Sequence, residues 1–181
     1  FFDIPVDHLL GANTLATYFK RRIKKAKKED YVIVSPDVGS VARARKFSQK
    51  MGDIPIAIVD KRRPRPNVSE VMNIIGDVRG KHCIIMDDMV DTAGTMCQAA
   101  VALVEKGGAA EVCAAATHGV LSGPAITRLA ESPISEFVVM DTIAIPEEKR
   151  IEKVKVLSVA SVFAEAIERI YEELPVSTLF S

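Results

Sequence analysis

Strand-like and helix-like segments alternate along this chain. Apolar runs rich in Val, Ile and Ala are typical of strands buried on both faces, and they are separated by segments in which apolar residues recur every three to four positions. Leu15, Phe19 and Ile23 show the second pattern, which indicates an amphipathic helix. The predicted strands are 31–36, 54–60, 82–88, 111–119, 136–141 and 154–159, with 71–78 as a short strand or turn. The predicted helices are 13–28, 41–51, 95–106, 123–132 and 161–173.

This alternation predicts an α/β fold with a mostly parallel sheet flanked by helices. The chain has 181 residues, of which 48% are hydrophobic, and this suits one domain with a substantial core. Neither an internal repeat nor a low-complexity linker divides it. We therefore expect residues 1–181 to form a single domain.

Composition excludes several classes of function. The 24 basic and 24 acidic residues give a net charge of +0, which argues against nucleic-acid binding. No apolar run approaches 18 residues, so no membrane partner is expected. The cysteines, Cys83, Cys97 and Cys113, are odd in number and form no CxxC pair, which supports neither a zinc site nor a disulfide framework. We expect Cys83 and Cys113 to be core thiols in a reducing, cytoplasmic protein.

The segment IIMDDMVDTAGT (84–95) combines carboxylates with a turn of small residues. Small residues at the start of a helix let backbone amides approach a phosphate closely. Asp87 and Asp88 would repel a bare phosphate, and instead suit hydroxyl groups or a metal. A sugar phosphate satisfies both halves. The alternative is that Asp87 and Asp88 merely end a strand and Asp91 caps a helix.

Two further loops follow predicted strands. SPDVGS (35–40) follows the first, and DKRRPRPN (60–67) follows the second. The prolines and cations of the latter exclude a helix interior or a central strand and predict a loop, which by itself could be no more than a solvated basic surface. Because ligands of parallel sheets bind beyond the carboxyl ends of the strands, we expect the three loops to converge.

These motifs resemble a known family. DDxxDTAGT (87–95) resembles the motif of type I phosphoribosyltransferases and phosphoribosyl diphosphate (PRPP) synthetases. FFDIPVDHL, SPDVGSVARAR, DKRRPRPNVSEVMNIIGDV, ATHGVLSGPA and VSTLFS together resemble ribose-phosphate pyrophosphokinases from end to end. The likeness is to the C-terminal half of that two-domain enzyme, so the N-terminal half is expected to be absent here.

The resemblance implies a type I phosphoribosyltransferase fold and a Mg²⁺-dependent reaction. In that reaction the diphosphate of ATP is transferred to ribose 5-phosphate, giving PRPP and AMP. The implied catalytic residues are Lys61 and Arg63, and the implied metal ligand is Asp37. The implied pyrophosphate loop is Asp37, Val38, Gly39 and Ser40. The implied site for ribose 5-phosphate or PRPP is Arg63, Asp87, Asp88, Asp91, Thr92, Ala93, Gly94 and Thr95.

Other implied features carry less weight. Asp3 and Asp7 resemble a segment sometimes assigned to divalent cations, although caps or turns explain them equally well. Ser177 aligns with an allosteric phosphate site in which Pro175 replaces a usual serine. Ser40 stands where the family has a second glycine, and serine does not freely adopt a positive φ. His8 and His118 are expected to be plain hydrogen-bonded histidines.

The family's adenine contacts lie in its N-terminal half, so this chain alone is expected to bind ATP weakly and to turn over little. Neighbouring subunits of a homo-oligomer would complete the ATP and allosteric sites. Two other functions share the central motif. A salvage phosphoribosyltransferase would need a base-binding hood and has no reason to carry KRRPRPN. A non-catalytic regulatory homologue should have lost Lys61, Arg63 or the acids of the motif, and this chain keeps them.

Overall fold

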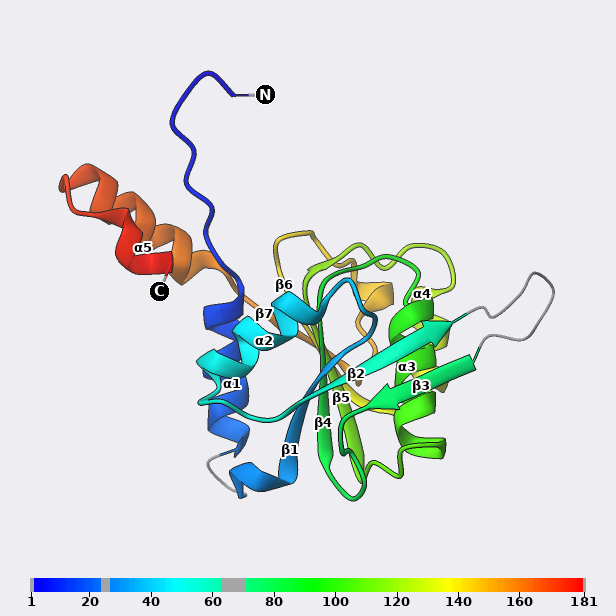
Figure 1. Ribbon diagram of the computed structural model, residues 1–181. Coiled ribbons are helices and arrows are strands. Elements are labelled where there is room, and N and C mark those ends of the chain that lie inside the picture. The colour runs from blue at the N-terminus through cyan, green and yellow to red at the C-terminus, as the bar shows by residue number, and fades with distance from the viewer. Residues whose placement is uncertain (1, 24–26, 63–70, 181) are drawn as a thin grey trace.

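The computed structural model describes residues 2–23, 27–62 and 71–180. Within them lies a seven-stranded sheet with the order β3-β2-β1-β4-β5-β6-β7 (Figure 1). Neighbouring strands pair in parallel except β2 and β3, which form an antiparallel edge. The α/β fold with a mostly parallel sheet is therefore confirmed.

The elements follow the predicted order. The strands are β1 Tyr31–Ser35, β2 Ile56–Arg62, β3 Val71–Ile75, β4 His82–Val90, β5 Glu111–Gly119, β6 Ile134–Met140 and β7 Val154–Leu157. The helices are α1 Ala12–Ile23, α2 Val41–Lys50, α3 Gly94–Glu105, α4 Ala125–Glu131 and α5 Ala160–Tyr171. Short 3₁₀ helices are η1 Lys28–Asp30, η2 Glu147–Lys149 and η3 Val176–Phe180.

Helices cover both faces of the sheet and enclose two apolar layers. In Figure 1, α1 and α2 lie on one face and α3 and α4 on the other. Side chains alternate between the layers along each inner strand. Ile84 packs with Phe19 and Phe47 beneath α1 and α2, whereas Ile85 packs with Leu103 and Leu129 beneath α3 and α4. Double-sided burial explains why these strands read as continuous apolar runs.

Several predicted boundaries were wrong, and three of them show why. The strand predicted to end at Asp88 continues to Val90, because it pairs with β5 as far as Gly119. The strand predicted to end at Asp60 includes Lys61 and Arg62, because β3 pairs with it in antiparallel register. The helix predicted over 13–28 ends at Ile23, and Lys28 begins a 3₁₀ helix. For the two strands, pairing with a neighbouring strand decided the end, and such pairing is not visible in local periodicity.

The other local predictions have clear outcomes. Cys83, Cys97 and Cys113 are buried free thiols, as expected for Cys83 and Cys113. The segment predicted as strand or turn contributes β3. In the described part of the chain, no helix is long and apolar enough to cross a membrane.

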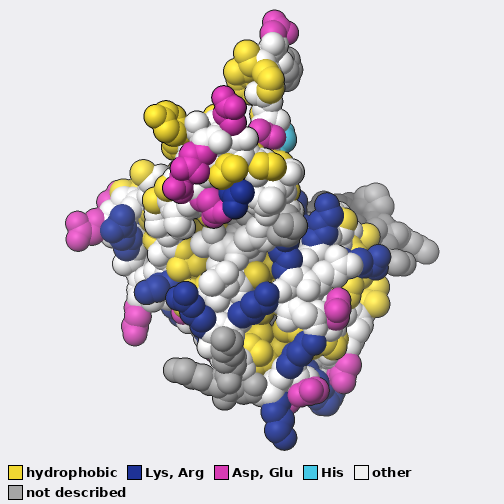
Figure 2. Space-filling view, turned by 90° about the vertical axis from the view of Figure 1, so that its left-hand side faces the viewer, with side chains coloured by type: hydrophobic (Ala, Val, Ile, Leu, Met, Phe, Trp, Pro, Cys, Tyr) yellow, Lys and Arg dark blue, Asp and Glu magenta, His cyan; other side chains and the backbone are white. Residues whose placement is uncertain are grey.

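The N-terminal segment and α5 extend away from the sheet (Figure 1). Exposed hydrophobic side chains gather there, and Figure 2 shows them on the projection at its top, mixed with acidic groups. The most exposed are Phe2, Ile4, Phe163, Ile167, Ile170 and Tyr171. This projection adds little to the two core layers.

We expect Phe19→Ala to lower the free energy of unfolding by roughly 3–5 kcal/mol, the usual cost of removing a buried Phe. Phe19 is 0% exposed and makes an edge-to-face contact with Phe47 that joins α1 to α2. Urea unfolding measures the change. The matched control is Phe163→Ala on α5, where the ring is 52% exposed and the expected change is below about 0.5 kcal/mol. Equal losses in both variants would contradict this description of the core.

Candidate functional site

Two of the three predicted ligand loops meet at the carboxyl edge of the sheet, and residues 63–67 of the third lie outside the described residues. A cavity of about 200 Å³ opens there, lined by Asp37 and Asp87 and by the consecutive residues 89–96. Asp37 comes from the loop after β1, and the rest come from the end of β4, the turn after it and the start of α3. Because β1 and β4 are parallel neighbours, their carboxyl ends lie side by side. The expected convergence of these two loops is therefore observed.

The 91–95 turn presents a cluster of backbone amides. Ala93 adopts the left-handed conformation, with φ 58° and ψ 8°, and α3 begins at the next residue. The first backbone bond of α3 runs from Cys97 N to Ala93 O at 3.0 Å. The amides of Gly94, Thr95 and Met96 thus precede the hydrogen-bonded part of the helix and have no intrahelical acceptor. Free amides at a helix N-terminus form an anion site, and these border the cavity.

The loop after β1 is built around Asp37. Ser40 N donates to Asp37 Oδ1 at 2.8 Å, and Ser35 Oγ donates to Asp37 O at 2.7 Å. Ser40 has φ −90°, so the position does not require the positive φ that would favour glycine. Serine fits here without strain, and its hydroxyl lies 3.4 Å from Asp87 Oδ1. The substitution therefore adds a link between the two loops.

Arg43 on α2 binds the carboxylates of Asp87 and Asp88. Its Nη1 donates to Asp87 Oδ1 at 3.0 Å and its Nη2 donates to Asp88 Oδ2 at 2.6 Å. The same Nη1 lies 3.0 Å from Ser40 Oγ. One guanidinium thus partly neutralises two neighbouring acids and ties them to the loop after β1.

The two acids differ in burial and therefore in pKa. Burial raises the pKa of Asp87 to about 6, with a contribution from the Asp88 carboxylate and against the opposing charge of Arg43. Burial alone would also raise the pKa of Asp88, but the hydrogen bond with the Asp87 side chain and the Arg43 charge outweigh it and lower that pKa. The Asp87 side chain is 17% exposed and that of Asp88 59% exposed. The inner acid is thus the more easily protonated of the pair.

Lys61 reaches the same end of α3 from the sheet edge. It lies on β2, not in a loop as predicted, and its Nζ donates to Gln98 Oε1 at 3.3 Å. Gln98 follows Thr95 by one helical turn, so this contact brings the cation to the N-terminal half of α3. Arg63, the other predicted catalytic residue, lies outside the described residues.

Several predicted residues lie elsewhere. Asp3 and Asp7 belong to the extended N-terminal segment and do not line the cavity. Ser177 lies in η3 beside α5 and is also remote from the cavity. His118 is hydrogen-bonded to Thr142 Oγ1 at 2.9 Å, in agreement with its predicted role as a plain hydrogen-bonded histidine.

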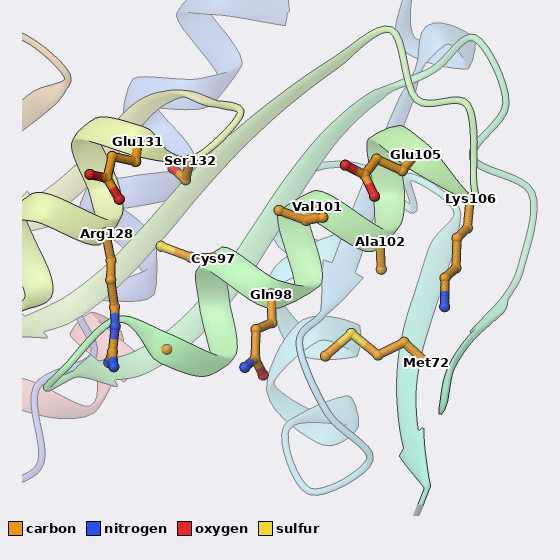
Figure 3. A pocket seen from close by; sticks show the side chains of 11 residues that line it. Met72, Cys97, Gln98, Val101, Ala102, Glu105, Lys106, Arg128, Glu131 and Ser132 are labelled. Carbon is orange, nitrogen blue, oxygen red and sulfur yellow. The ribbon is translucent and has the colours of Figure 1, made fainter. Parts of the chain in front are cut away.

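A second, larger depression adjoins the first. It measures about 580 Å³ and lies along α3 between β3 and α4 (Figure 3). Gly94 lines both cavities, so the start of α3 separates them. Gln98 and Arg128 also line the larger depression. Gln98, the residue that accepts a hydrogen bond from Lys61, is thus part of its wall.

Sequence reasoning missed Arg43, Gln98 and Arg128. Arg43 lies one helical turn after Ser40 on α2, a spacing that could have suggested a side chain facing the same site. Gln98 likewise lies one helical turn after Thr95. For Arg128 no signal was available, because α4 reaches the turn only through tertiary packing.

The family profile of the phosphoribosyl synthetase-associated domain matches residues 42–181. The chain belongs to the phosphoribosyl synthetase family. It is similar to the ribose-phosphate pyrophosphokinase of Clostridium acetobutylicum, with 61% identity over 180 residues that cover 99% of this chain and 55% of the relative. The corresponding protein of Caldanaerobacter subterraneus subsp. tengcongensis is 61% identical over 181 residues, covering 100% and 56%.

A solved structure agrees with this membership. The crystal structure of phosphoribosylpyrophosphate synthetase from Mycobacterium smegmatis matches with a TM-score of 0.84 and 42% identity, covering 95% of this chain and 54% of that chain. The expected family and fold are thus confirmed. The present chain spans about half the length of the synthetases it matches.

The raised pKa of Asp87 predicts that the ionised Asp87 carboxylate lowers the stability of this chain. Between about pH 4 and 6 the native state holds a proton on Asp87 that the unfolded state has lost, so this group's contribution falls as pH rises. We expect Asp87→Asn to raise the free energy of unfolding at pH 7.5 by roughly 1–3 kcal/mol, since each pKa unit corresponds to about 1.4 kcal/mol. The gain should vanish near pH 4. Urea unfolding at the two pH values measures it.

Asp88→Asn is the matched control. The pKa of Asp88 is lowered, so its carboxylate stabilises the native state above its unfolded pKa and loses that effect on acidification. This variant should be less stable than the unmodified chain at pH 7.5. Losses of similar size in both variants would contradict the assignment of Asp87 as the strained acid.

Proposed function

We propose that this chain is the sugar-phosphate-binding domain of a ribose-phosphate diphosphokinase, which transfers the diphosphate of ATP to ribose 5-phosphate and yields PRPP and AMP. The observation that carries the proposal is the shared cavity, whose wall includes Asp87, Thr95 and Asp37. Carboxylates at one end suit ribose hydroxyls, and free amides at the other suit its phosphate. Membership in the phosphoribosyl synthetase family supports the same assignment.

The ribose end of the ligand is assigned to Asp87 and Asp88, and its 5-phosphate to residues 91–95. To bind hydroxyls, the acids must exchange part of their contact with Arg43 for contact with the sugar. Arg43 lies against Ser40 in the loop after β1, so a released guanidinium would remain near the transferring diphosphate. Residues 37–40 are assigned to that diphosphate.

Mg²⁺ is the proposed cofactor, and the donor set fits it. No group of three or more potential metal-ligating side chains occurs among the described residues, which argues against an all-protein cage. Mg²⁺ is usually held by one or two carboxylates together with substrate phosphates. Asp37 offers such a carboxylate, since Ser40 N binds only its Oδ1 and the residue lines the cavity. The ion would neutralise charge on the phosphates.

Lys61 and Arg63 are the proposed catalytic residues. Phosphoryl and diphosphoryl transfer need little covalent help from the protein, so cations that stabilise the developing charge supply most of the catalysis. The position of Lys61 beside α3 supports a role at the diphosphate of PRPP.

The remaining assignments concern the whole protein. We infer that residues 1–181 form one phosphoribosyltransferase-like domain that corresponds to the C-terminal half of a two-domain enzyme, because the chain spans about half its relatives. ATP, PRPP and phosphate are proposed ligands, and the cytoplasm is the proposed location. Neighbouring subunits of a homo-oligomer would complete the ATP site and the allosteric phosphate site of Ser177. The exposed apolar groups of α5 support such an assembly.

The proposal predicts that the chain binds ribose 5-phosphate at least roughly tenfold more tightly than either ribose or inorganic phosphate, because both ends of the cavity are then used. Isothermal titration calorimetry with the three ligands measures this. With ATP, Mg²⁺ and ribose 5-phosphate, AMP release should be near zero. Absence of ribose 5-phosphate binding would contradict the proposed function, and AMP release at the rate of a full-length ribose-phosphate pyrophosphokinase would contradict the domain assignment.

Lys61→Ala should distinguish binding of the diphosphate end of PRPP from binding of its ribose 5-phosphate end. We expect it to weaken PRPP binding roughly tenfold, since a charged contact to the diphosphate is lost, and to leave ribose 5-phosphate binding within about twofold. Lys20→Ala, which removes an exposed cation of α1, serves as the control and should alter neither affinity. An equal loss for both ligands would place Lys61 at the ribose end instead.

A further inference from the structure

The 91–95 turn is anchored from outside the cavity by the segment that joins β5 to α4. Three consecutive carbonyl groups, those of Val90, Asp91 and Thr92, accept hydrogen bonds from that segment or from Arg128 on α4. The bonds are Val120 N and Leu121 N to Val90 O at 3.0 and 3.1 Å, Ser122 N to Asp91 O at 3.0 Å, and Arg128 Nη1 to Thr92 O at 2.9 Å. The Ser122 hydroxyl also donates to the Asp91 carboxylate.

These bonds determine where the amides of the turn point. A trans peptide unit directs its C=O and N–H in opposite directions, and the described residues contain no cis peptide bond. Holding Thr92 O on the α4 side therefore turns the N–H of Ala93 away from α4. Holding Asp91 O does the same for the N–H of Thr92. Both residues line the small cavity, which is where the proposed phosphate binds.

The conformation of Ala93 makes such support necessary. A left-handed alanine is disfavoured by contact between its Cβ and the backbone, and it persists only where surrounding contacts fix it. Arg128 holds the carbonyl just before Ala93, and the first bond of α3 holds the carbonyl of Ala93 itself. Loss of the Arg128 bond would leave one side of the strained residue unsupported.

Arg128 also brings a positive charge to the turn. Figure 3 shows its side chain extending from α4 toward the loop at the start of α3. Its Nη1 would lie 3.3 Å from a Cβ added at Gly94, so the guanidinium packs directly against the turn. Among the described residues no carboxylate forms an ion pair with it, and its charge therefore adds to the positive potential of the amides.

We propose that Arg128 and Ser122 are positioning residues that hold the 91–95 turn in the shape that accepts a sugar phosphate. Neither residue needs to touch the ligand. The inference rests on the proposed binding of ribose 5-phosphate, but the shape of the turn can be tested without any ligand.

The test compares Arg128→Gln and Arg128→Lys with Arg21→Gln, which removes an exposed arginine of α1. Arg128→Gln should weaken ribose 5-phosphate binding roughly tenfold, because a charged hydrogen bond and a nearby cation are both lost. Arg128→Lys should lose less, since its ammonium can donate to the same carbonyl. Arg21→Gln should bind as the unmodified chain does. Calorimetry gives the affinities, and thermal unfolding checks that each variant is folded.

Amide spectra of the ligand-free proteins supply a readout that a general loss of stability would not move. The ¹H–¹⁵N resonances of residues 92–95 should shift in Arg128→Gln and stay in place in Arg21→Gln. Unshifted resonances, or binding by Arg128→Gln within twofold of the unmodified chain, would overturn the proposal. If the unmodified chain binds no ribose 5-phosphate, the proposed function fails, and the ligand-free spectra alone decide whether Arg128 shapes the turn.

Discussion

The proposed site depends on placing carboxylates and the amides of the 91–95 turn in one cavity without letting the carboxylates repel the ligand that the amides bind. Asp87 and Thr95 both line about 200 Å³ of space, and a sugar phosphate spans them only if negative charge stays at one end. Arg43 contributes to this separation. By binding Asp87 and Asp88 together, it partly neutralises the two carboxylates on the side of the loop after β1.

The same arrangement explains why the acids belong to a strand. β4 continues past Asp88 to Val90, and its pairing with β5 fixes the backbone on which both carboxylates stand. A loop would let the acids move apart and relieve their repulsion, whereas the strand keeps them at adjacent positions. Burial is the main cause of the raised pKa of Asp87, and the neighbouring Asp88 carboxylate adds to it. Stability given up at a binding site is the expected consequence of fixing charges in advance of the ligand.

The sequence was sufficient to predict those features of the fold and of the site that depend on neighbouring residues. The apolar runs predicted the strands because both sheet faces are covered, and DDMVDTAGT placed carboxylates and small residues within one short segment. Long-range contacts were not predictable in this way. Arg43 meets Asp87 across 44 positions of the chain and Arg128 meets Thr92 across 36, and no spacing rule connects such pairs. The extent of β2 was misjudged because its partner β3 lies beyond the prolines that suggested a loop.

The two halves of the proposed site rest on parts of the sheet with different pairing. The proposed sugar-phosphate cradle lies on β1 and β4, which are paired on both sides, and three of its backbone carbonyls are bonded to the β5–α4 segment or to Arg128 on α4. Lys61 lies on β2, next to the antiparallel edge strand β3, and its Nζ donates to the Gln98 side chain on α3. A preorganised cradle avoids reorganisation when the phosphate binds. Under the proposed function, a cation carried by the sheet edge would shift its contact from Gln98 to a diphosphate without disturbing the cradle, so the proposed sugar site would stay fixed while the transferred group binds and leaves.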